Sequence, residues 1–400
     1  MIEPRLGVTW RPLPASSIVI KAGYGLYPDT SVYQSLILNM AQQAPLSKSL
    51  SVQNSTSCPL TLANGFASCG TGASATFGID PNFRIGYAQN WQLSVQRDLP
   101  FALQVSATYS GIRGTHGAQQ ILPNSYPLGT ANPCPSCTSG FIYQTSGGNS
   151  MRHAGQLQVR RRLRSGFAAS LVYTYAKAMD DDAYLGGVGH VGASTTQSAG
   201  LTTPSASIAQ NWRDPHGERS LSSFDQRQLV NLQAQYTSGQ GLGGGTLLSG
   251  WRGRALKEWT LAGNLIIGTG IPETPIYPAA VPGTGFSSIL RPALTGAPIY
   301  TSGSAAHLNA AAYTAPVGAW GTAGRNSITG PGQLTFNTQM ARTFRPHGKW
   351  YLDVAIGANN LLNHPAYTSW NSLITSEQFG YPASAGAMRS VQTTFHLRWQ

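Results

Sequence analysis

The chain has 400 residues and a formal net charge of +12, yet only 10% of its residues are charged, whereas soluble proteins carry roughly 25%. Glycine (46 residues), proline (25) and aromatic residues (10%) are plentiful, and the mean hydropathy is −0.15. No stretch reaches the roughly 18–20 consecutive apolar residues of a membrane-spanning helix. This excludes a helical membrane protein, disfavours an ordinary soluble enzyme, and leaves a propeller, a β-solenoid or a transmembrane barrel.

Apolar and polar residues alternate with a period of two in eleven segments, which is typical of strands with one apolar and one polar face. In the segment 101–112, for example, Leu103, Val105 and Tyr109 share one face, and Gln104 and Ser106 share the other. In chain order, the predicted strands are about 5–11, 17–27, 87–98, 101–112, 154–164, 167–178, 226–237, 257–270, 332–345, 349–361 and 389–399.

The links between these segments are alternately short and long. The long ones are 28–86, 113–153, 179–225, 271–331 and 362–388. Short periplasmic turns and long extracellular loops are typical of outer-membrane barrels, whereas a soluble propeller would repeat every 40–50 residues or so. The sequence therefore predicts an all-β, antiparallel, up-and-down transmembrane β-barrel segment. Its last strand runs downward, so that the C-terminus lies in the periplasm.

Aromatic residues lie near the ends of the predicted strands, as the interface girdles of membrane barrels require. The alternative is that they form the core of a large β-sandwich, but a sandwich does not explain the alternating loop lengths. The predicted girdles are Trp10, Tyr236, Trp259, Trp350 and Trp399 near the short turns, and Tyr27, Trp91, Tyr109 and Tyr175 near the long loops.

Five short phrases of the sequence are familiar in this order: 89–97 (QNWQLSVQR), 111–116 (GIRGTH), 224–227 (FDQR), 324–332 (GRNSITGPG) and 360–367 (NLLNHPAY). Together they resemble strand and loop phrases of the Oar-like TonB-dependent receptors, which are large outer-membrane proteins. The resemblance runs along essentially the whole chain, but only to the C-terminal half of the family barrel.

This resemblance implies a barrel of about 22 strands around an N-terminal plug domain that binds TonB. Residues 1–400 contain eleven predicted strands, and we find no plug, TonB box or signal peptide in them. An open sheet would leave two unpaired edges in lipid, which is costly. We therefore expect residues 1–400 to be the C-terminal part of a barrel domain whose N-terminal half and plug belong to a longer receptor.

The function implied by the resemblance is binding and energised uptake of a large solute at the cell outer membrane, with outer-membrane lipid, the plug and TonB as partners. Two alternatives stay open. One is a non-transporting surface adhesion or structural barrel, and the other is a soluble β-rich carbohydrate-binding protein. We find no catalytic constellation and predict neither an enzyme nor a cofactor. The one dense basic run, 160–164, has no nucleic-acid-binding motif beside it, so no nucleic-acid partner is expected.

Charged residues on the predicted polar strand faces should point into the lumen, where a cationic lining would steer anionic solutes. The simpler interpretation is that these side chains contact a polar plug or water in the complete protein. The candidates are Lys21, Arg160, Arg162, Arg164, Asp353 and Arg398.

The four cysteines lie in two long loops. Two local disulfides, Cys58–Cys69 and Cys134–Cys137, are the preferred interpretation for an oxidising exterior. A zinc site that combines Cys134 and Cys137 with neighbouring histidines stays open as the alternative. The acidic run 180–182 could hold Ca²⁺, although a solvated loop start is favoured over a metal site.

Overall fold

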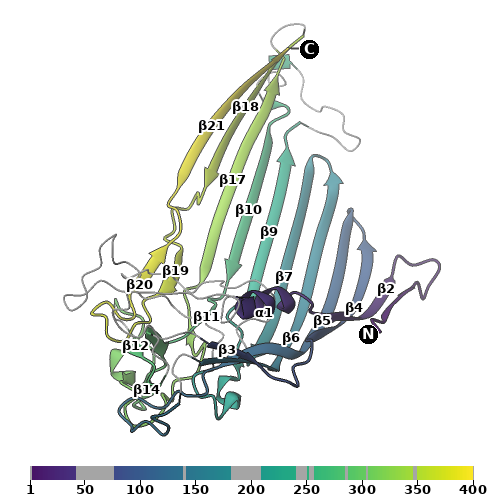
Figure 1. Cartoon of the computed structure of the whole chain (residues 1–400). Helices are drawn as coiled ribbons and strands as arrows, with labels where there is room; N and C mark the ends of the chain where they lie inside the picture. The colour runs from purple at the N-terminus through teal and green to yellow at the C-terminus, as the bar shows by residue number, and fades with distance from the viewer. Residues whose placement is uncertain are drawn as a thin grey trace.

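A computed structural model describes residues 2–41, 76–137, 141–181, 209–239, 250–251, 256–283, 287–302, 305–345 and 349–399. One large, curved antiparallel sheet dominates it (Figure 1). No helix in these ranges is long and apolar enough to cross a membrane. The predicted all-β antiparallel fold is confirmed.

The strands of the main sheet path follow one another in chain order, and each lies in or overlaps one of the predicted segments. The path does not close, because β1 and β21 stand at its two ends. The path consists of β1 (Arg5–Trp10), β2 (Val19–Pro28), β4 (Tyr87–Leu99), β5 (Leu103–Ile121), β6 (Phe141–Arg164), β7 (Phe167–Asp180), β9 (Gln228–Thr237), β10 (Thr260–Gly268), β17 (Gln333–Phe344), β18 (Trp350–Asn359) and β21 (Ser390–Trp399).

Strands β5 and β6 extend well beyond the predicted segments, into the region expected to be a long loop. Their pairing continues past two register shifts near Gly117, and β3 (Thr76–Ile79) adds to the extended part of β6 in parallel. The bulges let the hairpin bend as it leaves the main sheet. Strict alternation ends at these bulges, which is why the sequence pattern ended too early.

The two faces of the sheet differ sharply. One row of cross-strand partners is wholly apolar: Val105, Val159, Leu171, Leu232, Leu265 and Phe336. The neighbouring row, on the other face, is polar: Gln104, Arg160, Ser170, Gln233, Asn264 and Asn337. We call these the apolar face and the polar face.

The apolar face is exposed, since Leu261 is 51% accessible and Phe395 is 68% accessible. A soluble protein would bury these side chains. One predicted girdle residue, Tyr27, does not lie on the apolar face, so this part of the prediction is wrong. It lies on the polar face, where the Arg5 guanidinium stacks 4.8 Å above its ring. Tyr24 is the residue of β2 that pairs with Trp91 on the apolar face.

The long loops carry short strand pairs and 3-10 turns. These elements are β8 (Ser220–Leu221) beside β7, β11 (Pro272–Glu273) with β16 (Ile328–Thr329), β12 (Tyr277–Ala280) with β13 (Ser287–Leu290), β14 (Ala293–Leu294) with β15 (Tyr313–Thr314), β19 (Tyr367–Trp370) with β20 (Pro382–Ala385), η1 (Pro215–Glu218) and η2 (Ala310–Ala312). A helix, α1 (Val32–Ala41), follows β2.

We call the described parts of 122–137, 209–225, 271–331 and 362–388 the loop assembly. It gathers at the end of the sheet opposite the C-terminus (Figure 1). Its loops hydrogen-bond to one another, as when Trp212 Nε1 donates to the carbonyl of Ser125 at 3.0 Å. The assembly encloses a buried apolar cluster of Leu308, Ala312, Tyr313, Ala323, Ile328 and Phe379.

Candidate functional site: the polar face and the loop assembly

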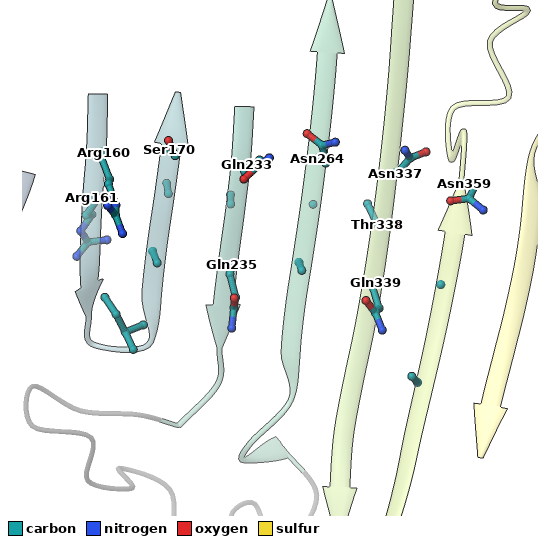
Figure 2. Close-up of a pocket in the computed structure, with 18 of the residues that line it drawn as sticks. Arg160, Arg161, Ser170, Gln233, Gln235, Asn264, Asn337, Thr338, Gln339 and Asn359 are labelled. Atoms are coloured by element: carbon teal, nitrogen blue, oxygen red, sulfur yellow. The ribbon is translucent and has the colours of Figure 1, made fainter. Parts of the chain in front are cut away.

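The polar face of β6 to β21 lines an open hollow of about 900 Å³. Its lining is rich in side-chain amides and hydroxyls because the polar positions of five neighbouring strands coincide in register. Figure 2 shows these side chains extending from neighbouring strands. Labelled polar-face members are Arg160, Ser170, Gln233, Gln235, Asn264, Asn337, Gln339 and Asn359. Such a surface can hydrogen-bond water or a polar solute without a strong charge of either sign.

The predicted lumen charges are distributed over this face. Arg160 and Arg162 border the hollow, and Arg162 forms an exposed ion pair with Asp98 at 3.2 Å. Lys21 pairs in register with Ser94, away from the hollow. Arg164 lies beyond a register shift, beside the short turn, and pairs with Phe167.

Asp353 and Arg398 meet on β18 and β21 near the short-turn end. Arg398 Nε donates to the Asp353 carboxylate at 2.8 Å and its Nη2 donates at 3.1 Å, so the contact is bidentate. Thr343 also donates to this carboxylate at 2.6 Å, and His396 lies 3.6 Å from it. Both charges are therefore largely engaged with each other rather than with a solute.

The acidic run 180–182 is not a solvated loop start at its first residue. Asp180 is 1% accessible and pairs with Arg325, which also donates to the Asp180 carbonyl at 2.7 Å. Asp181 accepts from the backbone of Asn149, and residue 182 lies outside the described ranges. Within those ranges no cluster of His, Cys, Asp and Glu could hold a metal ion.

The Asp180–Arg325 pair belongs to a larger buried network. Arg325 Nε donates to the carbonyl of Glu218 at 3.1 Å, and the Glu218 carboxylate accepts two bonds from Arg291, at 2.8 and 2.9 Å. Arg291 Nε in turn donates to the carbonyl of Ala323 at 3.0 Å. The network joins the end of β7 to the loop assembly. No motif or periodicity in the sequence marks Glu218 or Arg291 as members of this network.

Residues of the other motifs that resemble Oar-like receptors also connect strand ends to loops. The Asp225 carboxylate accepts from the Ala178 backbone at 2.6 Å and pairs with Arg227 at 3.3 Å. Asn326 Nδ2 donates to the carbonyl of Leu221 at 2.6 Å. Asn360 has a positive φ of 46° and caps the end of β18, where its Nδ2 donates to the carbonyl of His364 at 2.9 Å.

Trp91 and Gly111 form a close contact between two strands on the apolar face. The two residues are register partners, and the indole covers the glycine so closely that an added Cβ would lie 2.2 Å from the Trp91 ring. His153, the next partner in the row, contacts Trp91 edge-on and accepts or donates a 2.7 Å hydrogen bond with Tyr109.

Glu273 joins two loops of the assembly. Its carboxylate accepts from the Trp370 backbone N–H at 3.1 and 3.2 Å. Burial raises the pKa of Glu273 to about 7, and the Trp370 hydrogen bond opposes part of this rise. The Trp370 ring stacks on His307 with 4.7 Å between centroids, so ring and carboxylate groups are gathered at one place between β11 and β19.

Cys134 and Cys137 form a disulfide in the structure, which leaves neither sulfur as a thiolate for zinc. Cys58 and Cys69 lie outside the described residues, so their pairing stays a prediction.

A sheet with one exposed apolar face, one polar face and a folded cap of loops defines a membrane β-barrel protein. The family described as "outer membrane beta barrel domain" matches residues 1–392, and the chain belongs to this family. Its location is the outer membrane.

Three solved structures are similar to this chain, and the first of them supports the fold. The outer membrane transporter YddB from Escherichia coli superposes with a TM-score of 0.50 at 10% identity, covering 99% of this chain and 40% of that one. The ferripyoverdine receptor of Pseudomonas aeruginosa follows with 0.47, 14% identity, and coverage of 99% and 32%. The ferric-catecholate import receptor Fiu from E. coli K12 gives 0.44, 11%, 98% and 34%. This chain spans less than half the length of each. No curated protein sequence matches it.

Proposed function

We propose that residues 1–400 form the C-terminal half of the barrel of an Oar-like, TonB-dependent outer-membrane transporter. In this proposal the loop assembly faces the exterior and recognises the solute, while the short turns and the C-terminus face the periplasm. The missing N-terminal region supplies the plug and the contact with TonB. The two-faced sheet, open at both edges, is the observation that carries the proposal.

The edges limit what can close the barrel. All neighbours on the main path are antiparallel, so the first strand and the last, β1 and β21, run in the same direction. An antiparallel partner must therefore begin and end with strands of the opposite direction, and its strand number is odd. A second copy of this chain, in the same membrane orientation, would meet both edges in parallel. The missing half of a longer chain meets the requirement with about eleven further strands of a 22-stranded barrel.

Energised uptake is tested by expressing the complete reading frame in cells that place the protein in their outer membrane. If the proposal holds, these cells should deplete at least one solute of a complex medium, measured by mass spectrometry, and cells without TonB should not. Equal solute concentrations in the media of both strains would refute transport. Cell adhesion that persists without TonB would then favour the non-transporting surface barrel.

Arg160 and Arg162 are proposed to contact the plug or lumen water rather than to select the solute, because amides dominate the face around them. Changing both to Ala in the complete receptor should leave the depleted solute unchanged. A selective loss of anionic solutes would instead establish electrostatic steering.

A further inference from the structure

The positive charge of the chain is concentrated at one end of the sheet. Within five residues of a short turn, or at the end of β21, the described ranges hold twelve basic residues and only three acidic ones, whereas the whole sequence has 26 and 14. Twelve positive charges less three negative ones leave nine of the net twelve at this end. The basic residues are Arg11, Lys21, Arg97, Lys257, Arg342, Arg345, Lys349, Arg398 and the four arginines of 160–164.

Two of the three carboxylates at this end form ion pairs on the polar face. Asp98 pairs with Arg162 and Asp353 pairs with Arg398, and both arginines lie on that face. The third acidic residue, Glu258, lies in the link before β10. The negative charge of these two ion pairs therefore lies on the lumen side of the sheet, while further cations lie on the opposite, apolar face.

Three of these cations form what we call the basic belt: Arg97, Arg161 and Lys349. A further cation of the apolar face, Arg342, is only 7% accessible and is not a member. Register places Arg97 beside Val105, and Arg161 beside Leu103, on the apolar face. The Arg161 guanidinium lies 4.8 Å from the centroid of the Phe167 ring.

Aromatic rings also accompany Lys349 of the belt and the buried Arg342 beside it in the chain. The Arg342 guanidinium lies 4.4 Å from the Phe344 ring and 5.7 Å from that of Trp259, and Lys349 Nζ lies 5.8 Å from the Trp399 ring. Aromatic side chains of this kind mark the boundary between hydrocarbon and headgroups. The belt therefore lies at headgroup depth, on the side of the sheet that meets lipid.

We propose that the basic belt binds the anionic phospholipid headgroups of the membrane leaflet that surrounds the short turns. A basic side chain near an anionic bilayer surface is attracted to it, and a guanidinium matches the geometry of a phosphate. The stacked rings hold the cations against the boundary. The proposal rests on the outer-membrane placement and on the exposed apolar face, and does not require transport.

The test uses the full-length protein in neutral detergent micelles, titrated with dibrominated phosphatidylglycerol or dibrominated phosphatidylcholine. Bromine quenches nearby tryptophan fluorescence, and Trp399 lies beside Lys349 of the belt. We expect tighter binding of the anionic lipid, and a preference that weakens as NaCl rises from about 50 to about 500 mM. Equal affinity for the two lipids would overturn the proposal, whatever the outcome of the uptake assay.

Substitutions test which residues cause the preference for phosphatidylglycerol. Neutralising Arg97, Arg161 and Lys349 together to Gln should reduce the preference for phosphatidylglycerol by roughly tenfold or more. A matched triple change of exposed basic residues at the loop end, Arg84→Gln, Arg113→Gln and Arg213→Gln, should change it less than about twofold.

A charge-preserving set, with Lys in place of the two belt arginines, separates charge from packing. This set should retain most of the preference. A loss as large as that of the Gln set, or an equal loss in the loop-end set, would overturn the assignment. Mobility of unheated samples in gels verifies that each variant is folded, and the salt titration of the unchanged protein tests the proposal without any substitution.

Discussion

Changing Arg325 to Met should release the loop assembly from the sheet. The guanidinium contacts the carboxylate and carbonyl of Asp180 and the carbonyl of Glu218. Without it, the Asp180 side chain, which is only 2% accessible, is left as a buried charge beside an aliphatic chain. Methionine is chosen because it keeps most of the volume of the arginine stem, so that a cavity contributes little.

The expected cost follows from the burial of the pair. Breaking a buried ion pair by removing one partner costs about 3–5 kcal/mol. Since about 1.4 kcal/mol is a factor of ten, amide protection in the loop assembly should fall by about two to three powers of ten. The strands of the main sheet should keep their protection, because local opening leaves other cooperative units intact.

Hydrogen–deuterium exchange in detergent micelles measures this, peptide by peptide, across 287–331. The exposed pair of Arg162 and Asp98 supplies the control, since its side chains are 58% and 42% accessible. Arg162→Met should therefore cost less than about 1 kcal/mol. Combining Arg325→Met with Asp180→Asn should cost less than the sum of the two single changes. A loss of protection below tenfold in Arg325→Met would refute the reasoning.

Two further results are expected. Gly111→Ala should displace the Trp91 ring and cost about 1–3 kcal/mol, seen as a shifted tryptophan emission and a lower melting temperature; Gly155→Ala, where an added Cβ meets nothing within 4 Å, should change neither. Burial raises the pKa of Glu273 to about 7 from 4.5, so the folded loops hold a proton that the unfolded chain releases, and stability should fall as the pH rises from about 4.5 to about 7. Glu273→Gln should remove that slope and stabilise the loops at pH 8 by about 1–2 kcal/mol after screening; identical slopes in both proteins would contradict the burial argument.

The membrane sheet could be predicted from the sequence because lipid imposes a strict rule on every strand. A residue such as Val159 must face hydrocarbon, and its neighbour Arg160 must not, so the period of two persists along the chain. The same rule fails where the strands leave the membrane. Beyond Gly117 both faces of the β5–β6 hairpin meet water or protein, the alternation fades, and the predicted boundary comes too early.

The loop assembly could not be predicted for the opposite reason. Its buried cluster joins residues as far apart as Leu308 and Phe379, and its ion pairs join Asp180 to Arg325 across 145 residues. No periodicity records such contacts. The short motifs that resemble Oar-like receptors do include Asp225, Arg325 and Asn360, which all connect strand ends to loops. The motifs do not indicate which residues these three contact.

Charge is scarce in this chain because two of its surfaces are apolar: the sheet face that meets lipid and the buried cluster of the loop assembly. The apolar face of the main sheet is exposed in the described ranges and requires lipid, and β1 and β21 leave its two edges unpaired there. The loop assembly, in contrast, buries Leu308 and Ile328 as a soluble domain does. Three places hold much of the charge: the buried pairs that join loops to sheet, the lumen pairs of Asp98 and Asp353, and the end of the sheet where the basic belt meets headgroups. A net charge of +12 on a chain with so few charged residues is thus chiefly a property of one membrane interface rather than of the protein surface as a whole.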